Sequence, residues 1–133
     1  MTLGEIKDEI MFQTNNDSDD IEDYLPYVDN YINEGYDKLV KAWGEVHVPT
    51  GDYARLVEDD DVPQLPEWTH RAICDWATWL VYRNGNPQKQ NRGLAYKSAF
   101  EEMLAKISDE GGASGLNPDG TQVKYNKFRN IPV

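Results

Sequence analysis

Residues 65–107 constrain the fold most tightly, because they read as two amphipathic helices joined by a very short corner. In each helix the apolar residues recur at three- and four-residue steps, which gathers them on one face. In the first helix they are Trp68, Ala72, Ile73, Trp76, Ala77, Leu80 and Val81. In the second they are Leu94, Ala95, Ala99, Phe100, Met103, Leu104 and Ile107. The pattern predicts two helices that pack on one another.

The corner between these helices carries its own signals. Gly85 follows the first helix at a position where a left-handed residue is favoured, so it is expected to end that helix. Asn86 and Pro87 are suited to be the N-cap and first residue of the next helix. So short a connection makes the two helices antiparallel, as an αα-hairpin onto which the rest of the chain must pack.

The length of 133 residues fits one domain, with four Trp, eight Tyr and three Phe to build its core. A lone Cys74 excludes an intramolecular disulfide, and two His residues leave no plausible zinc site. No apolar run approaches the ~20 residues that span a bilayer, and the N-terminus lacks the features of a signal peptide. We therefore expect a soluble protein that matures in a reducing compartment, without a metal or cofactor.

The net charge of −11 is distributed unevenly. Residues 1–65 contain 4 basic and 17 acidic side chains, a net charge of −13. Residues 66–133 contain 9 basic and 7 acidic side chains, a net charge of +2. An acidic first half argues against binding to a phosphate backbone, which requires clustered Lys and Arg. Charge alone favours nothing more specific than a solvated face.

Two helices are expected before the hairpin. Thr2 and Glu5 form a capping-box pattern ahead of a short helix that runs to about Gln13. Ser18 is a suitable N-cap for a long helix to about Trp43, with Pro26 predicting a kink or a separate first turn. The apolar faces comprise Leu3, Ile6, Ile10 and Met11 in the first helix, and Ile21, Tyr24, Leu25, Val28, Tyr31, Ile32, Gly35, Leu39 and Trp43 in the second. A mid-helix glycine usually indicates close approach of another helix.

Between residues 44 and 66 the helical period is lost. The segment contains three prolines and the acidic run of Glu58, Asp59, Asp60 and Asp61. Alternation at Val46 and Val48, and again at residues 55–57, would allow a small β-hairpin around residues 49–52. A connector of this length in a compact domain usually carries function or partner contacts.

The C-terminal segment has a mixed character. Val123, Tyr125 and Phe128 alternate with Lys124, Lys127 and Arg129, and Ile131 follows. We expect an extended arm that becomes ordered on a neighbouring chain; a mobile terminus is equally compatible with the sequence. The predicted fold is therefore all-α, a small bundle of about four helices over residues 1–109, followed by an arm at residues 110–133.

Candidate catalytic and binding groups are few. His70 and Cys74 lie one helical turn apart, as in a nucleophilic pair, but a buried cysteine beside a partly buried histidine explains them better. The acidic segment 15–23 does not begin a calcium loop: counted from Asp17, the sixth position should be glycine and the twelfth an acid, but they are Glu22 and Val28. Four cations, Arg83, Lys89, Arg92 and Lys97, cluster around the corner and suit a subunit interface better than a nucleic-acid site. An enzyme is not expected.

The order of these features resembles the head–tail connector (adaptor) proteins of tailed bacteriophages. The resemblance rests on LGEIKDEIMFQTNNDSDDIEDYLPYVDNYINEGYDKLVKAW and on LPEWTHRAICDWATWLVYRNGNPQKQNRG, separated by the irregular connector. It implies a structural part of the virion neck that assembles in the host cytoplasm. About twelve copies would form a ring on the portal protein, each making the same head-to-tail contact. The ring would extend the channel through which DNA passes without sequence-specific binding, and would meet a head-closure or tail protein below.

The resemblance also suggests roles for particular residues. Lys124, Tyr125, Phe128, Arg129 and Ile131 would contact the portal or a neighbouring subunit. Arg83, Lys89 and Arg92 would lie in the ring interface, and Glu58, Asp59, Asp60 and Asp61 would face the channel or the next neck protein. The alternative is a small acidic helical binding module, such as a phage-encoded regulator or a DNA mimic that inhibits a host protein.

Overall fold

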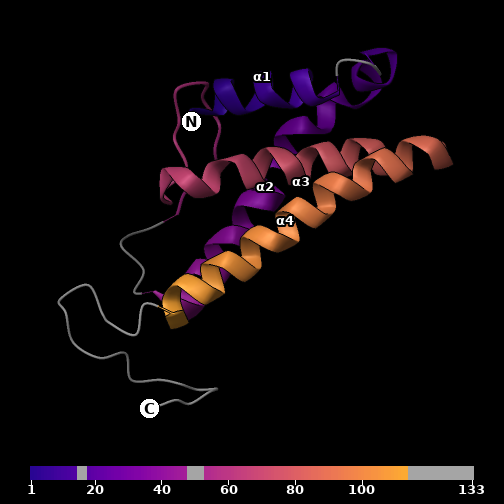
Figure 1. The fold of residues 1–133 in the computed structure, drawn as a ribbon. Helices are drawn as coiled ribbons and strands as arrows, with labels where there is room; N and C mark the ends of the chain where they lie inside the picture. The colour runs from indigo at the N-terminus through magenta and orange to yellow at the C-terminus, as the bar shows by residue number, and fades with distance from the viewer. Residues whose placement is uncertain (15–17, 48–52, 114–133) are drawn as a thin grey trace.

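The computed structural model describes residues 1–14, 18–47 and 53–113, with the backbone alone for residues 18–25 and 110–113. In order, its elements are α1 (Leu3–Gln13), α2 (Ser18–Val46), a short 3-10 helix η2 (Glu67–Thr69), α3 (His70–Arg83) and α4 (Pro87–Ala113). Helix α3 crosses the middle of the bundle, with α1 above it and the long helices α2 and α4 running past it (Figure 1). The predicted all-α bundle is confirmed for the described residues.

Helix α1 begins with the predicted capping box. The Thr2 hydroxyl accepts a hydrogen bond from the Glu5 amide at 3.1 Å, and the Glu5 carboxylate accepts one from the Thr2 amide at 2.8 Å. Leu3, Ile6 and Ile10 are fully buried, as the period predicted. These apolar side chains fix which face of α1 turns toward α3.

The connector before α3 completes the start of α1. The first two amides of the helix, those of Leu3 and Gly4, donate to the backbone carbonyls of Asp61 (2.8 Å) and Asp59 (2.9 Å). The Asp61 carboxylate in turn accepts from the amides of Val57 and Glu58, both at 2.8 Å. The acidic run therefore has a structural role, because it supplies acceptors to amides that have no partner inside the helix.

Helix α2 continues through Pro26 and ends three residues beyond Trp43. The close approach predicted at Gly35 is confirmed, because a Cβ atom there would lie 3.0 Å from the Cβ of Trp76 on α3. Two buried residues of this helix were missed by the periodicity. Tyr36 accepts a hydrogen bond from the Gln64 amide at 2.8 Å, and Asn33 binds both backbone groups of Leu56.

The β-hairpin expected in the connector does not form within the described residues. Val46, its intended first arm, belongs to the last turn of α2, and residues 53–57 are not in a strand. Its turn, residues 49–52, and Val48 lie outside the described residues. The side chain of Asn33 instead holds Leu56, because its amide group satisfies the Leu56 N–H (2.8 Å) and C=O (3.0 Å) together.

The αα-hairpin of α3 and α4 is confirmed, with one correction at its corner. Asn86 caps α4 by accepting a hydrogen bond from the Lys89 amide at 2.9 Å, and Pro87 is the first helical residue. Gly85, however, does not adopt the predicted left-handed conformation. A Cβ atom there would lie 2.9 Å from the Lys89 side chain, so glycine provides space for the corner. The Gln90 side chain donates to the carbonyls of Arg83 and Gly85.

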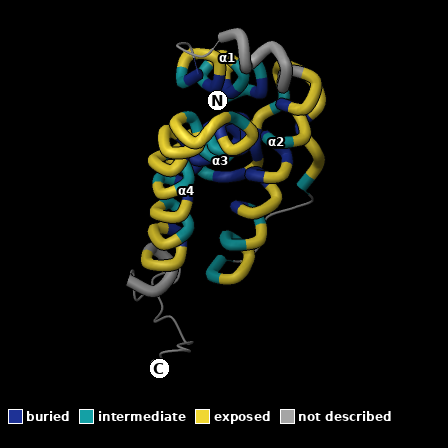
Figure 2. The backbone as a smooth tube through the Cα atoms, turned by 90° about the vertical axis from the view of Figure 1, so that its right-hand side faces the viewer, coloured by how far each residue is buried: buried dark blue, intermediate teal, exposed yellow. Residues whose placement is uncertain are grey.

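The buried face of α4 differs from the predicted one at its start. Leu94 is 47% exposed and Ala95 is exposed, whereas Gly93 is buried against α3. Farther along, Phe100 and Ile107 are buried as predicted, and the helix continues past Asp109 to Ala113. Beyond α3 the C-terminal halves of α2 and α4 extend together at the lower end of the bundle (Figure 2). The division into a domain at 1–109 and an arm at 110–133 stays a prediction.

Candidate functional site

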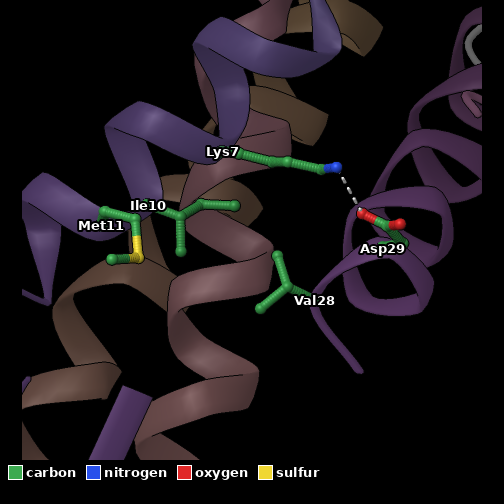
Figure 3. Close-up of a pocket in the computed structure, with 5 residues that line it drawn as sticks. All are labelled: Lys7, Ile10, Met11, Val28 and Asp29. Atoms are coloured by element: carbon green, nitrogen blue, oxygen red, sulfur yellow. Dashed lines mark ion pairs between the residues drawn. The ribbon is translucent and has the colours of Figure 1, made fainter. Parts of the chain in front are cut away.

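A small pocket opens between α1 and α2, with a volume of about 170 Å³ (Figure 3). Ile10 of α1 and Val28 of α2 are buried and supply apolar walls. Met11 lines the pocket and remains 44% exposed. Met11 was expected on the apolar face of α1, but it directly follows Ile10 and so lies about 100° around the helix from it, at the edge of that face. Its flexible thioether is suited to contact with an aromatic ring.

The polar edge of the pocket carries more negative than positive charge. Lys7 Nζ lies 3.2 Å from Asp29 Oδ1 and 3.5 Å from Asp59 Oδ1, so one ammonium group faces two exposed carboxylates. Figure 3 shows the Lys7 side chain extending from α1 toward Asp29 on α2. Burial lowers the pKa of Lys7, but the hydrogen bonds and charges of Asp29 and Asp59 outweigh it and raise the pKa overall. Lys7 therefore stays protonated, and one negative charge remains uncompensated within this group of three.

Further apolar surface is exposed on the two helices that form the pocket. Phe12 is 75% exposed, and Tyr27, which stacks on Tyr31, is 53% exposed. Together with Met11 they give α1 and α2 three large accessible apolar side chains. Such side chains, an apolar hollow and a negative edge suit the binding of an apolar group flanked by cations.

A second, wider groove lies between the C-terminal halves of α2 and α4, with a volume of about 330 Å³. Its lining combines apolar, cationic and anionic side chains: Lys38, Lys41, Ala42, Glu45, Val46, Leu104 and Ser108. On another side of these helices Trp68 packs edge-on against Trp43, and Lys106 Nζ lies 4.9 Å from the Trp68 ring centroid. Because Leu104 and Lys106 are two residues apart, they point to opposite sides of α4.

The structure argues against a nucleophilic role for His70 and Cys74. Both are buried, and both ring nitrogens of His70 are engaged elsewhere: Nδ1 lies 2.9 Å from the Met1 amino group and Nε2 lies 2.8 Å from the Leu65 carbonyl oxygen. Burial raises the pKa of the Cys74 thiol to about 12, so almost no thiolate exists at neutral pH. The predicted burial of Cys74 is confirmed, and His70 is fully rather than partly buried.

The remaining sequence-predicted residues lie at two ends of α3. Arg83 is in its last turn, and Lys89 and Arg92 lie in the first two turns of α4, so these three share one end. The run from Glu58 to Asp61 lies at the other end, beside the start of α1 (Figure 1). With 14 residues, α3 keeps the two groups about 20 Å apart. Lys124, Tyr125, Phe128, Arg129 and Ile131 lie outside the described residues.

A polar cluster between α1 and α3 was missed by the sequence analysis. Gln13 Nε2 donates to Asp75 Oδ1 at 3.1 Å, while Thr78 donates to Gln13 Oε1. Burial raises the pKa of Asp75, although the Gln13 hydrogen bond and Arg71 act in the opposite direction. The only sequence signal was the pair of polar residues Asp75 and Thr78 within an apolar helix, three residues apart and therefore on one face.

Comparison with known proteins adds little to this geometry. No protein-family profile matches the sequence, and no solved structure matches it. The chain is 29% identical over 97 residues to the large ribosomal subunit protein uL3 of Methanothermobacter thermautotrophicus. That match covers 73% of this chain, which spans about a quarter (26%) of the ribosomal protein's length. At this identity and coverage it does not show membership of that family.

Two kinds of feature are absent from the described residues. In that part of the chain, His, Cys, Asp and Glu do not gather in groups of three or more that could hold a metal ion. None of its helices combines the length and apolar character that crossing a bilayer requires.

Proposed function

We propose that this chain is a structural subunit of a phage virion neck, which forms a ring on the portal and extends the DNA channel. The observation that carries the proposal is that a group of cations and a group of acids lie at opposite ends of α3. The corner cations Arg83, Lys89 and Arg92 lie at one end, and the acidic run from Glu58 to Asp61 lies at the other (Figure 1).

A ring built from identical copies needs two different, complementary surfaces on each subunit, because every contact is head-to-tail. A subunit that carries three cations and an acidic run at opposite ends of α3 offers two such surfaces. In the proposed ring the corner cations contact one side of the acidic end of the next copy. The exposed carboxylates of Glu58, Asp59 and Asp60 that this contact leaves uncovered face the channel or the next neck protein. Carboxylates on a channel wall repel phosphates, so DNA would slide without sequence-specific binding.

The arm residues predicted from the sequence have a place in this proposal. Lys124, Tyr125, Phe128, Arg129 and Ile131 contact the portal or a neighbouring subunit, and the chain has a structural rather than a catalytic role. Copies made in the host cytoplasm would end in the virion neck, where a head-closure or tail protein continues the channel.

Co-assembly with the portal protein of the same genome tests the proposal. Electron microscopy of the mixture should show an added ring at the tail-facing end of the portal. Arg83→Glu, which reverses one exposed corner charge, should prevent the ring, whereas Lys41→Glu, the same reversal on α2 at the far end of the bundle, should not. An intact portal without an added wild-type ring would refute the neck assignment.

A second candidate follows from the net charge of −13 over residues 1–65. A small acidic helical module could bind a basic groove on a host protein, as a regulator or as a DNA mimic. Stoichiometry separates the two proposals. A ring component has many copies in purified particles, whereas an inhibitor pairs with one target and is absent from virions.

A further inference from the structure

We propose that the pocket between α1 and α2 receives the Phe128 side chain from the C-terminal segment of a second copy of this chain. The inference deepens the proposed function, on which it rests, because it supplies a specific contact between neighbouring subunits. A dry apolar cavity of about 150 Å³ accommodates a benzene ring. The pocket has a similar volume of about 170 Å³, with Ile10, Met11 and Val28 as apolar walls and with Lys7 and Asp29 at its open edge.

The charges at the pocket edge favour a particular occupant. Asp29 and Asp59 face a single Lys7 at the pocket edge, so a group arriving with positive charge is favoured. Phe128 is flanked directly by Lys127 and Arg129, which places a cation on each side of an apolar ring. Tyr125 fits less well, because only one of its direct neighbours is cationic.

The geometry favours a second copy over the same chain. The pocket lies at Val28, whereas the C-terminal end of α4 lies near Val46, because Ser108 and Val46 line one groove. The 18 residues of α2 between these points span about 27 Å. A segment from the same chain would have to span this distance back along α2. A second copy approaches from outside and avoids this path.

The methyl resonance of Met11 provides a direct test in the full-length protein, since the chain has only three methionines. With carbon-13-labelled methionine methyl groups, a ring seated in the pocket should shift the Met11 signal upfield. The shift should grow with concentration up to about 1 mM, where contacts with millimolar dissociation constants become populated. Phe128→Leu should abolish it, and Tyr125→Leu, the matched control, should retain it. Met103 on α4 does not line the pocket and serves as an internal reference.

Mixing labelled and unlabelled protein identifies which copy supplies the aromatic ring. Labelled Phe128→Leu protein, which lacks the ring, should regain the Met11 shift when unlabelled wild-type protein is added. A wild-type shift that is independent of concentration and is not restored by mixing would show that the occupant is the same chain. A Met11 signal unchanged by Phe128→Leu, or equally changed by Tyr125→Leu, would also overturn the inference.

The two proposals fail separately. If the wild-type chain adds a ring of subunits to the portal while the Met11 signal is the same with and without Phe128→Leu, only the pocket inference is wrong. If the Met11 shift behaves as expected but the portal gains no ring, copies associate through the pocket and the neck assignment is wrong.

Discussion

Three helical glycines make a graded test of how closely the helices pack. Gly44 has no heavy atom within 4 Å of an added Cβ, Gly35 would bring its Cβ to 3.0 Å from the Trp76 Cβ, and Gly93 would bring its Cβ to 2.8 Å from both the Tyr82 Cβ and the Trp79 ring. Replacing each with alanine adds the same atom to a helix. Only the space around that atom differs.

The balance between helix propensity and overpacking decides whether each substitution stabilises or destabilises the protein. Alanine stabilises a helix interior by up to about 1 kcal/mol relative to glycine, so Gly44→Ala should gain about 0.5–1 kcal/mol. Overpacking costs about 1–3 kcal/mol. Gly93→Ala should lie in the upper part of that range, because the Tyr82 Cβ is fixed to the backbone of α3 and cannot turn away. Its net loss is then about 1–2 kcal/mol, and Gly35→Ala should be close to neutral.

Urea denaturation followed by circular dichroism gives the free energy of unfolding for all four proteins. Gly44→Ala should be the most stable, wild type and Gly35→Ala should be similar to each other, and Gly93→Ala should be the least stable. Their m-values should be equal, because unfolding exposes the same surface in each protein. The melting temperature of Gly93→Ala should fall by several degrees. If Gly93→Ala were as stable as Gly44→Ala, the close packing of α4 on α3 would be wrong.

Other predictions concern polar and buried groups. Asn33→Ala should cost about 2–4 kcal/mol by denaturation, because it leaves the buried N–H and C=O of Leu56 without partners, whereas Asn30→Ala, at an exposed site, should cost little. Burial raises the pKa of Asp75, so its contribution to stability is fully present below the unfolded value of about 3.8 and is lost as pH rises through the folded value. In urea denaturation, the free energy of unfolding of Asp75→Asn should therefore increase relative to that of the wild type between pH 3 and pH 7. If the two free energies changed in parallel with pH, this prediction would be contradicted. Cys74 should react with a thiol reagent only as fast as the protein opens, since its thiol is buried and its pKa is about 12. Rapid labelling of the native protein at neutral pH would contradict the buried position.

The sequence predicted those parts of the fold that depend on local patterns. The capping box at Thr2, the N-cap at Asn86 and the close approach at Gly35 each follow from residues within a few positions of one another, and all three are confirmed. The errors arise where distant contacts decide. Leu94 fitted the apolar face predicted for α4, but the contact of Gly93 with Trp79 and Tyr82 turns Leu94 outward.

The candidate site was harder to predict, for the same reason. The Lys7–Asp29 pair joins residues 22 positions apart on two helices, and the pocket beside it depends on how those helices cross. Asn33 and Leu56 are 23 positions apart. No period within either helix specifies such a partner. The corner cations and the acidic run were identified from the sequence, but their separation by the length of α3 required the structure.

The attachment of the acidic run to α1 affects how freely this surface can vary. The amides of Leu3 and Gly4 bind backbone carbonyls of Asp61 and Asp59, and every amino acid has such a carbonyl. Of the four acidic side chains, that of Asp61 organises the turn, whereas those of Glu58 and Asp60 are exposed. Substitutions at these two positions can change what the surface binds while the helix start stays satisfied. A lineage could therefore adapt this end of the molecule to a new partner without first losing stability.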